Sequence, residues 1–352
     1  MENEVKLLKE LINIESYLEG ENKQIIAYFK EKLNKYKCIT IKNKNDDRES
    51  LIAFINYKKN CKPLLLCGHC DTVVKNNNLP CYESEGLLYG LGSCDMKCFF
   101  ASILANLEDL EKLGVPIVVA ITCDEEIKCE SVNLVVDYLK NENIFPFLTI
   151  LGEPTDMTIT SYSKGCYEYK VCVKGKACHS SNVKMGINSI NICAKLINLI
   201  EKLNTEKISL NCGLISGGKQ INIVPDYCEF SFDIRTYEKD LLNNALKLIN
   251  DEIENLLQTY AGCEIMLTNT LSLPCYSKKT ELANIVSQKL NVKTSYFNGA
   301  TEAGFYGEIS DEVIIFGAGD VALAHKQNEY VKIENVLNYY KILKKIIKIA
   351  KK

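Results

Sequence analysis

The chain contains three histidines, His69, His179 and His325, and each follows an apolar run or lies in a loop. His69 comes directly after the apolar run PLLLCG, and Asp71 stands two residues further on. An aspartate at that position can hydrogen-bond the second imidazole nitrogen, which fixes the tautomer and raises the basicity of a ligating histidine. A single histidine near a strand is more often a satisfied core residue. An interpretation as metal ligands therefore depends on the acidic residues nearby.

Acidic residues also stand where an apolar run ends or a predicted helix begins. Asp95 lies in the turn GLGSCDMK, which opens a predicted helix. Glu125 and Glu126 follow the run PIVVAITCD, and Glu153 follows the next run, in LGEPT. In an open α/β sheet, ligands bind in the crevice at the carboxyl ends of the strands. One such acid alone would more often cap a helix or contact solvent, but the whole set predicts one crevice lined by imidazoles and carboxylates.

These residue types favour metal-assisted hydrolysis. A bridging carboxylate can hold two divalent ions about 3.5–4 Å apart, with a terminal histidine and carboxylate completing each. Imidazole together with carboxylate suits zinc, and also cobalt or manganese. Because neighbours on an extended chain point to opposite sides, Glu125 and Glu126 should not share one ion. One of them can ligate while the other stays free as a base.

The elements that carry these residues alternate along the chain. Apolar runs on both faces predict strands at CITI, SLIAFINY, PLLLCG, PIVVAITC and FLTIL. Helical periodicity covers about 3–17, 22–36, 96–113 and 130–140. Strands of this kind separated by helices predict a doubly wound α/β fold with a mixed sheet.

The middle of the chain has a different pattern. From Cys166 to about Thr270 the predicted order is strand, helix, strand, strand, helix, strand, which is the ferredoxin-like arrangement. After Leu273-Pro274 the first pattern resumes with a helix over 279–290, the strand VIIFG and a long helix from about Ile333. We therefore expect a discontinuous catalytic domain, 1–164 with 272–352, and an inserted domain, 165–271.

Composition limits the partners. The 352 residues are 47% hydrophobic and 25% charged, with a net charge of −3 and a pI of about 5.9, so neither nucleic acid nor an anionic membrane is expected as a partner. The N-terminal residues lack the apolar core of a signal peptide, and no apolar run reaches the ~20 residues that span a bilayer. We expect a cytoplasmic protein whose seventeen cysteines are reduced thiols.

Over essentially its whole length the chain resembles the M20 family of metallopeptidases and deacylases. Seven segments carry the resemblance, in the family's order: GHCDTV (68–73), GLGSCDMK (90–97), TCDEE (122–126), GEPT (152–155), GKACHSS (175–181), NIVP with DIR (222–235) and AHKQNEYV (324–331). The resemblance implies a catalytic domain with two zinc ions and an inserted lid domain through which the protein forms a homodimer.

The resemblance also implies a role for each matching residue. His69, Asp95 and Glu153 would hold one metal ion. Asp95 would bridge to the second ion, which Glu126 and His325 would complete. Asp71 would orient His69, Glu125 would be the general base, and His179 of the lid would stabilise the oxyanion in the partner's site. Arg235 with Asn222 would bind the α-carboxylate of a small N-acyl amino acid, a task that suits a planar guanidinium.

Two segments bear on the substrate. ATEAGFY (300–306) and GAGDVALAH (317–325) resemble the acetylornithine deacetylases of the family more than its succinyl-diaminopimelate desuccinylases, which implies N-acetylornithine as substrate and a role in arginine biosynthesis. Glu302 would then face the cationic side chain of ornithine, or simply start a short helix. Gly317 would present a backbone amide to the substrate, or serve a plain turn. A desuccinylase, an aminoacylase and a dipeptidase stay open as alternatives.

A thiol–disulfide oxidoreductase is the alternative from another class, because Cys67-Gly68-His69-Cys70 forms a C-x-x-C pair. The chain has no tryptophan, and its pair falls at a strand end rather than at a helix start, which disfavours that interpretation. Cys70 and Cys94 flank candidate ligands, and we expect both side chains to point away from the metals. Cys98 and Phe99 stand where the family commonly has glycines, but they replace no ligand.

Overall fold

The computed structural model describes residues 3–17, 22–74, 80–278 and 281–351. The chain divides into two compact units. The first comprises Met1–Ser163, Lys278–Phe297 and Thr301–Lys352, and the second comprises Lys164–Ser277 and Asn298–Ala300. The expected boundaries are 164/165 and 271/272, whereas this division falls at 163/164 and 277/278 and also assigns 298–300 to the second unit. The first two positions of the helix predicted over 279–290 fall outside the described residues.

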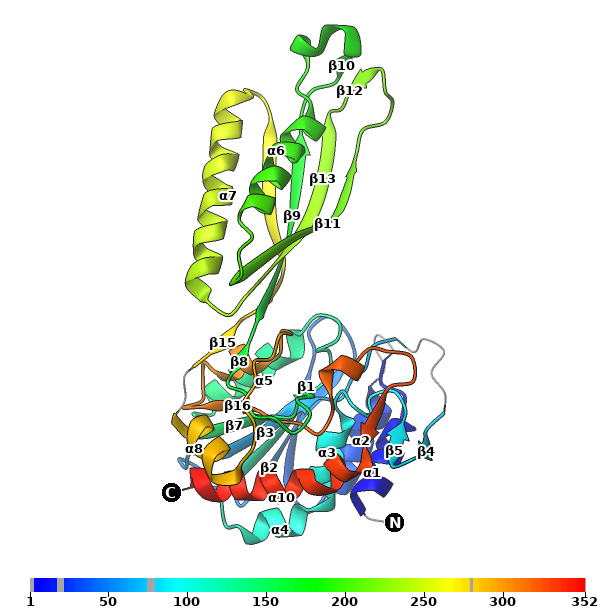
Figure 1. The fold of residues 1–352 in the computed structure, drawn as a ribbon, viewed down its shortest axis with the longest axis vertical. Helices are drawn as coiled ribbons and strands as arrows, with labels where there is room; N and C mark the ends of the chain where they lie inside the picture. Colours follow the sequence, from blue (N-terminus) through cyan, green and yellow to red (C-terminus); the bar gives the residue numbers. More distant parts are fainter. Residues whose placement is uncertain (1–2, 18–21, 75–79, 279–280, 352) are drawn as a thin grey trace. The chain divides into compact units, whose positions relative to one another are not determined.

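A six-stranded mixed sheet forms the centre of the first unit (Figure 1), in the order β1-β2-β6-β3-β7-β16. The strands are β1 (Lys37–Lys42), β2 (Glu49–Ile55), β3 (Leu64–His69), β6 (Ile117–Thr122), β7 (Leu148–Leu151) and β16 (Val313–Ile315). The neighbours β6, β3, β7 and β16 are parallel, whereas β2 runs antiparallel to both β6 and β1. Every residue of β3 and β6 is buried, as expected for strands covered on both faces.

Helices cover both faces of this sheet. Apolar side chains of α1, α2, α3 and α10 pack in one cluster with residues such as Leu64, Leu66 and Val119, and α5 contacts β1, β2 and β6 outside that cluster. The helices of this unit are α1 (Asn3–Ile12), α2 (Lys23–Lys32), α3 (Lys97–Ala105), α4 (Leu107–Lys112), α5 (Glu130–Asn141), α8 (Glu281–Leu290), α9 (Ala303–Tyr306) and α10 (Ile333–Ala350), with the 3₁₀ turn η2 (Val321–Leu323).

Three predicted helices are shorter in the structure, and the helix predicted over 22–36 ends at Lys32. The helix predicted over 3–17 ends at Ile12, and the ammonium of Lys97 donates to the carbonyls of Leu11 and Ile14 just there, at 3.1 and 2.9 Å. The helix predicted over 96–113 divides into α3 and α4 at Asn106. The Asn106 amide donates to the carbonyl of Ser102 at 2.9 Å, and such side-chain bonds to the preceding turn compete with a regular helix.

A small sheet escaped the sequence prediction because its strands are only three residues long. It contains β4 (Tyr82–Ser84), β5 (Leu87–Tyr89) and β17 (Tyr330–Lys332), in the order β17-β5-β4. Its pairing joins the segment before Asp95 to the segment after His325, since Tyr330 stands opposite Tyr89. The two-residue strand β8 (Tyr162–Ser163) completes the first unit.

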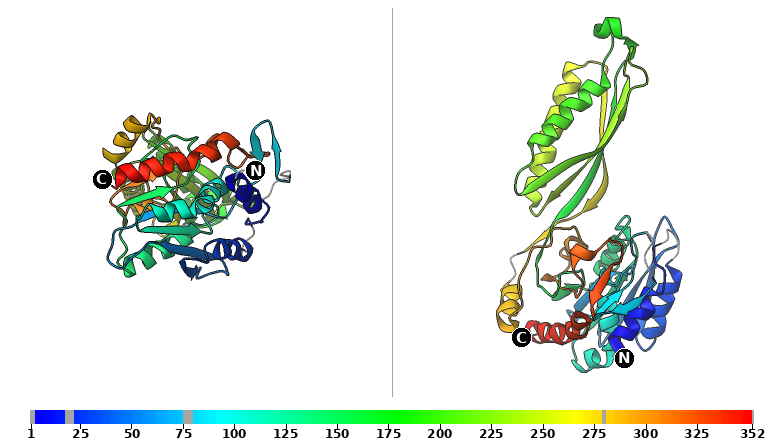
Figure 2. Two further views of the ribbon diagram at one scale, coloured as in Figure 1. Left: turned by 90° about the horizontal axis from the view of Figure 1, so that it is seen from below. Right: turned by 45° about the vertical axis from the view of Figure 1, so that its right-hand side comes forward.

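The second unit has a four-stranded antiparallel sheet in the order β11-β13-β9-β14, with α6 and α7 on one face (Figure 2). Its elements are β9 (Gly165–Lys174), β10 (Cys178–His179), η1 (Ser180–Met185), α6 (Ser189–Lys202), β11 (Ile208–Gly217), β12 (Ile223–Val224), β13 (Tyr227–Thr236), α7 (Lys239–Thr259), β14 (Glu264–Leu273) and β15 (Tyr276–Ser277). Alternate residues of β9 and β13, such as Val171 and Phe230, pack with Leu196 and Ile249 of the helices. In the described residues of the whole chain, no helix is long and apolar enough to cross a membrane.

Candidate metal centre

The candidate ligands gather at the carboxyl ends of three adjacent parallel strands. β3 ends at His69, and the loops after β6 and β7 carry Glu126 and Glu153. Asp95 stands two residues before α3, and His325 lies in the loop between η2 and β17. The site is therefore built from four loops and one strand end, which is where an open α/β sheet presents side chains to a ligand.

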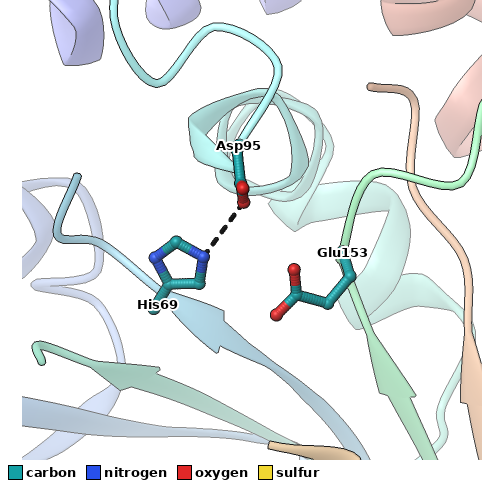
Figure 3. Close-up of side chains that lie close together, drawn as sticks. All are labelled: His69, Asp95 and Glu153. Atoms are coloured by element: carbon teal, nitrogen blue, oxygen red, sulfur yellow. Dashed lines mark hydrogen bonds and ion pairs between the residues drawn. The ribbon is translucent and has the colours of Figure 1, made fainter. Parts of the chain in front are cut away.

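His69, Asp95 and Glu153 form one ligand group, with donor atoms within 4.8 Å of one another. His69 Nε2 lies 3.1 Å from Asp95 Oδ1, and the three side chains converge on one space (Figure 3). His69 is 0% and Glu153 4% exposed. Within the described part of the chain, the buried Oε1 of Glu153 has no hydrogen-bond partner. A buried acceptor of this kind needs a partner, and a cation would supply it.

Asp95, Glu126 and His325 form the second group. His325 Nε2 lies 2.8 Å from Glu126 Oε1 and 3.6 Å from Asp95 Oδ2. Asp95 thus directs one carboxylate oxygen to His69 and the other to His325. This is the arrangement of a carboxylate shared between two neighbouring ions.

The donor set fits two divalent ions. Two ligand atoms held at about 2.0–2.1 Å by one tetrahedral zinc lie roughly 3.3 Å apart. The nitrogen–oxygen distances of 3.1, 2.8 and 3.6 Å lie around that value. Burial raises the pKa of Glu153 well above its ordinary value, and the neighbouring Asp95 carboxylate adds to the rise. Positive charge placed between the carboxylates would oppose this rise in pKa.

Glu125 lies beside the ligands. It contributes a donor atom near His69 and Glu126 in a third candidate group, so its carboxylate belongs to the same cluster. Burial raises the pKa of Glu125 well above its ordinary value, and Glu153 and Glu126 raise it further while His69 opposes them. A carboxylate with a raised pKa is better matched to proton transfer near neutral pH.

Asp71 contacts His69 through its main chain and not, as expected from the sequence, through its carboxylate. The contact with His69 Nδ1 at 3.0 Å is made by the backbone carbonyl of Asp71, and the nearest carboxylate oxygen is 3.6 Å away. The carboxylate of Asp71 accepts the backbone N–H groups of Glu125 and Glu126, at 3.2 and 3.0 Å. Asp71 therefore orients the imidazole through its main chain and fixes the base and a ligand through its side chain.

Asp124 is a supporting residue to which the sequence analysis assigned no role. Its buried carboxylate accepts the backbone N–H groups of Glu130 and Ser131 at the start of α5, at 3.0 and 2.9 Å. Its backbone carbonyl accepts three further N–H groups, from residues 127–129. These bonds fix the loop that carries Glu125 and Glu126. The TCDEE segment was a signal for this residue, but nothing in the segment alone distinguishes a supporting acid from a ligand.

Glu302 is not placed as the sequence suggested. Its side chain is 0% exposed, and burial raises its pKa to about 8. It immediately precedes α9, yet it makes no side-chain capping bond to that helix. An acid that faces a cationic substrate needs access to it. Glu302 is instead an interior carboxyl of the first unit, and this corrects the expectation of a substrate contact.

Gly317 also differs from its expected role. Its N–H donates to the hydroxyl of Thr155 at 3.0 Å, so this amide is already engaged within the protein. A Cβ at this position would lie 2.2 Å from the carbonyl oxygen of Glu153 and 2.5 Å from that of Gly152. Gly317 is therefore required for close approach of two backbones beside a ligand. The alternative of a structural glycine is the one that the geometry favours.

The candidate substrate residues of the second unit lie at its two ends. His179 pairs with Ile223, and the N–H of Ser180 donates to the Asn222 carbonyl at 3.0 Å, so His179 and Asn222 are neighbours. Arg235 stands near the other end of β13, opposite Cys166. The eight residue-to-residue steps of strand from Tyr227 to Arg235 span about 26 Å at ~3.3 Å per step. One copy of the chain therefore does not bring Asn222 and Arg235 together.

All seventeen cysteines are free thiols. Cys67 and Cys70 are both 0% exposed, and burial raises the pKa of each well above its ordinary value. Thiols that are buried and protonated are unreactive toward disulfides, which argues against the oxidoreductase alternative. Cys94 is buried, and its thiol donates to the carbonyl of Asp320 at 3.0 Å.

Comparison with known proteins agrees with this geometry. The model of peptidase family M20/M25/M40 matches residues 65–349, which include every candidate metal ligand. The chain belongs to this family. It is therefore a hydrolase of a metal-dependent family, built as a mixed α/β fold.

Individual M20 proteins are similar over nearly the whole chain. The acetylornithine deacetylase of Buchnera aphidicola is 29% identical over 378 residues, covering 98% of this chain and 97% of the relative. A tripeptidase from Staphylococcus aureus has a similar fold, with a TM-score of 0.81, 21% identity and coverage of 99% and 98%. A Bacillus subtilis protein described as a dinuclear metal binding peptidase of the M20 family gives a TM-score of 0.72 at 15% identity, covering 97% and 96%.

Proposed function

We propose that this M20 enzyme hydrolyses the amide bond of a small N-acyl amino acid, with N-acetylornithine as the first choice, using two zinc ions. The observation that carries the proposal is the pair of ligand groups that share Asp95, with the Glu125 carboxylate beside His69 and Glu126. The relatives named acetylornithine deacetylase support the choice of substrate. Release of ornithine and acetate would give the protein a role in cytoplasmic arginine biosynthesis.

His69, Asp95 and Glu153 would hold one ion, and Asp95, Glu126 and His325 the other. When bound, the ions would supply a water of lowered pKa and polarise the amide carbonyl. Glu125 accepts a proton from the attacking water and returns it to the nitrogen of the leaving amine. The hydrogen bonds from the Glu125 and Glu126 backbone N–H groups to Asp71 hold the Glu125 carboxylate beside the metal ligands.

The substrate carboxylate would be bound by the second unit. Arg235 donates through Nε to Asp233 at 2.9 Å and is 39% exposed, so its terminal nitrogens are suited to a bidentate contact with a carboxylate. His179 is exposed, and its Nδ1 is held by Ser181 at 2.8 Å, which directs Nε2 outward for an oxyanion. Asn222 would complete this set.

We further propose that the second unit is a ferredoxin-like lid through which two copies form a homodimer. Within one copy, His179 and Asn222 lie at one end of β13 and Arg235 at the other, so a second copy is needed to surround one small substrate. Large apolar side chains are exposed on the edge strand β11 and beside β12, at Leu214 (72%), Ile215 (61%) and Ile221 (102%). Light scattering should give twice the chain mass, and Ile215→Lys should yield monomers that lose activity. A wild-type monomer with full activity would refute the dimer.

The experiment that tests the function is amide hydrolysis by the zinc-loaded protein. N-acetylornithine, N-succinyl-diaminopimelate, N-acetyl-methionine and a tripeptide are compared in parallel, with and without a chelator. Chelator-sensitive preference for N-acetylornithine is the expected result. Chelator-sensitive preference for another compound would keep the metal chemistry and replace the substrate. Absence of turnover with all four would refute the proposal.

A further inference from the structure

Glu329 lies between the two loops that carry Asp95 and His325, and its side chain is 3% exposed. One carboxylate oxygen accepts the N–H groups of Cys94 and Asp95, at 2.7 and 3.0 Å, and the other accepts that of Gly92 at 3.0 Å. The backbone carbonyl of Glu329 accepts the N–H of Gly90 at 2.9 Å. A single residue therefore makes four hydrogen bonds to the turn that presents Asp95.

The turn that presents Asp95 needs a hydrogen-bond acceptor where the Glu329 carboxylate lies. Gly92 has a φ of +78°, and a Cβ there would lie 2.8 Å from a methyl carbon of Thr72, so the turn is tightly enclosed. Its N–H groups converge on one point, and backbone donors buried without an acceptor are costly. A carboxylate accepts several such donors more strongly than a neutral group does. Glu329 is the group that satisfies them.

Glu329 also fixes the loop that carries His325. His325 is four residues before Glu329, and β17, which begins directly after Glu329, pairs with β5 just before the Asp95 turn. A shift of Glu329 would therefore move His325 and Asp95 relative to each other. These two residues belong to the ligand group that also contains Glu126.

The first ligand group depends less on this contact. His69 is the last residue of β3, which is paired on both sides by β6 and β7, and Glu153 stands two residues after the end of β7. Their positions are fixed by the sheet. Of the three residues in the first group, Asp95 alone is carried by the turn that Glu329 holds.

We propose that Glu329 is a positioning residue for the second metal ion, because its carboxylate ties the turn of Asp95 to the loop of His325. This inference rests on the proposed dinuclear site and adds a residue that binds neither ion. It predicts that loss of the Glu329 carboxylate affects the two metal sites unequally.

The test is calorimetric titration of chelator-treated full-length protein with zinc, repeated with cobalt as a spectroscopic probe. Glu329→Ala should keep one site near the wild-type affinity and weaken the other by about 10–100-fold, the usual effect of removing a supporting contact. Glu329→Gln keeps the shape and one acceptor oxygen but turns a donor toward the backbone N–H groups, so a smaller effect on the same site is expected. Glu334→Ala, at an exposed acid in the first turn of α10, is the matched control and should bind as wild type.

Equal weakening of both sites, or unchanged binding at both, would overturn the positioning role. Glu329→Gln decides the question if Glu329→Ala fails to fold, which circular dichroism and thermal melting would reveal. If the wild-type protein binds two zinc ions and the Glu329 variants change the affinity of both sites equally or not at all, only the inference about Glu329 is refuted. Wild-type protein that binds no zinc would refute the dinuclear function together with it.

Discussion

Gly317→Ala is a small change with a large expected effect on metal binding. The new methyl group would lie 2.2 Å from the carbonyl oxygen of Glu153, whereas ordinary contact begins at 3.4 Å. The backbone beside Glu153 would therefore have to move by the difference, 1.2 Å. The atom that is met belongs to the main chain, so rotation of a side chain cannot relieve the contact.

The size of this shift can be compared with what a metal site tolerates. Ligand distances are held to within about 0.2 Å, so a displacement of 1.2 Å in the segment of Glu153 is several times larger. We expect zinc affinity to fall at least ~10-fold at the site that contains Glu153. Overpacking of this kind costs about 1–3 kcal/mol, which corresponds to a fall in Tm of roughly 2–12 °C for a unit of this size.

Zinc titration and thermal melting of the metal-free protein measure the two effects separately. Gly213→Ala is a suitable control, because the nearest atom to its new Cβ is the Asn211 side-chain nitrogen at 3.6 Å. The control should bind zinc and melt as wild type. If Gly317→Ala binds zinc with unchanged affinity and stoichiometry, the argument from close backbone approach is wrong.

Three further outcomes are expected. Glu125→Gln should lower kcat by about 10²–10⁴-fold and leave zinc stoichiometry intact, as measured by steady-state assay and titration. Removal of the ions by a chelator should abolish turnover and lower Tm, both restored by zinc, because the ions bind the folded state alone. The third concerns acid stability. The Arg48 guanidinium, at 2.6 Å, holds the pKa of Asp46 below its usual range, so the folded chain binds that proton less readily than the unfolded chain. The resulting stability is present above about pH 4 and lost as the pH falls through the folded pKa. Asp46→Asn should therefore cost about 1–3 kcal/mol at pH 7 and make stability depend less on pH in the acid range. An acid-unfolding curve identical to that of the wild type would refute this role of the Asp46–Arg48 pair.

The parts of the fold that were predictable are those with a strong periodic signal. The run IVVAIT is apolar on both faces, and it forms β6, a fully buried strand at the centre of the sheet. The strands β4 and β5 have three residues each, too few for an alternating pattern to appear. The break between α3 and α4 depends on side-chain bonds around Asn106 that helical periodicity does not reveal.

The candidate ligands were predictable because each follows a strand or opens a helix, and strand ends meet at one edge of a sheet. The supporting residues were not. Glu329 stands in a loop of polar residues, and only the fold shows that its carboxylate is enclosed by backbone N–H groups. Glu302 illustrates the opposite error, since a charged residue suggested an exposed contact and the structure buries it. Burial depends on long-range packing, which local sequence does not encode.

The discontinuous first unit has a consequence for synthesis on the ribosome. β16 pairs with β7, and α10 packs against α1 and α3, yet both elements are made only after the whole second unit has been translated. At about 5–20 residues per second, the ~75 residues from Lys278 to Lys352 take roughly 4–15 s to be synthesised. During that interval β16 and α10 are not yet complete, while nearly all of the second unit has been synthesised. Five of the six strands of the sheet are therefore made before β16 can pair with the exposed edge of β7, and we expect the nascent chain to be prone to aggregation at this stage.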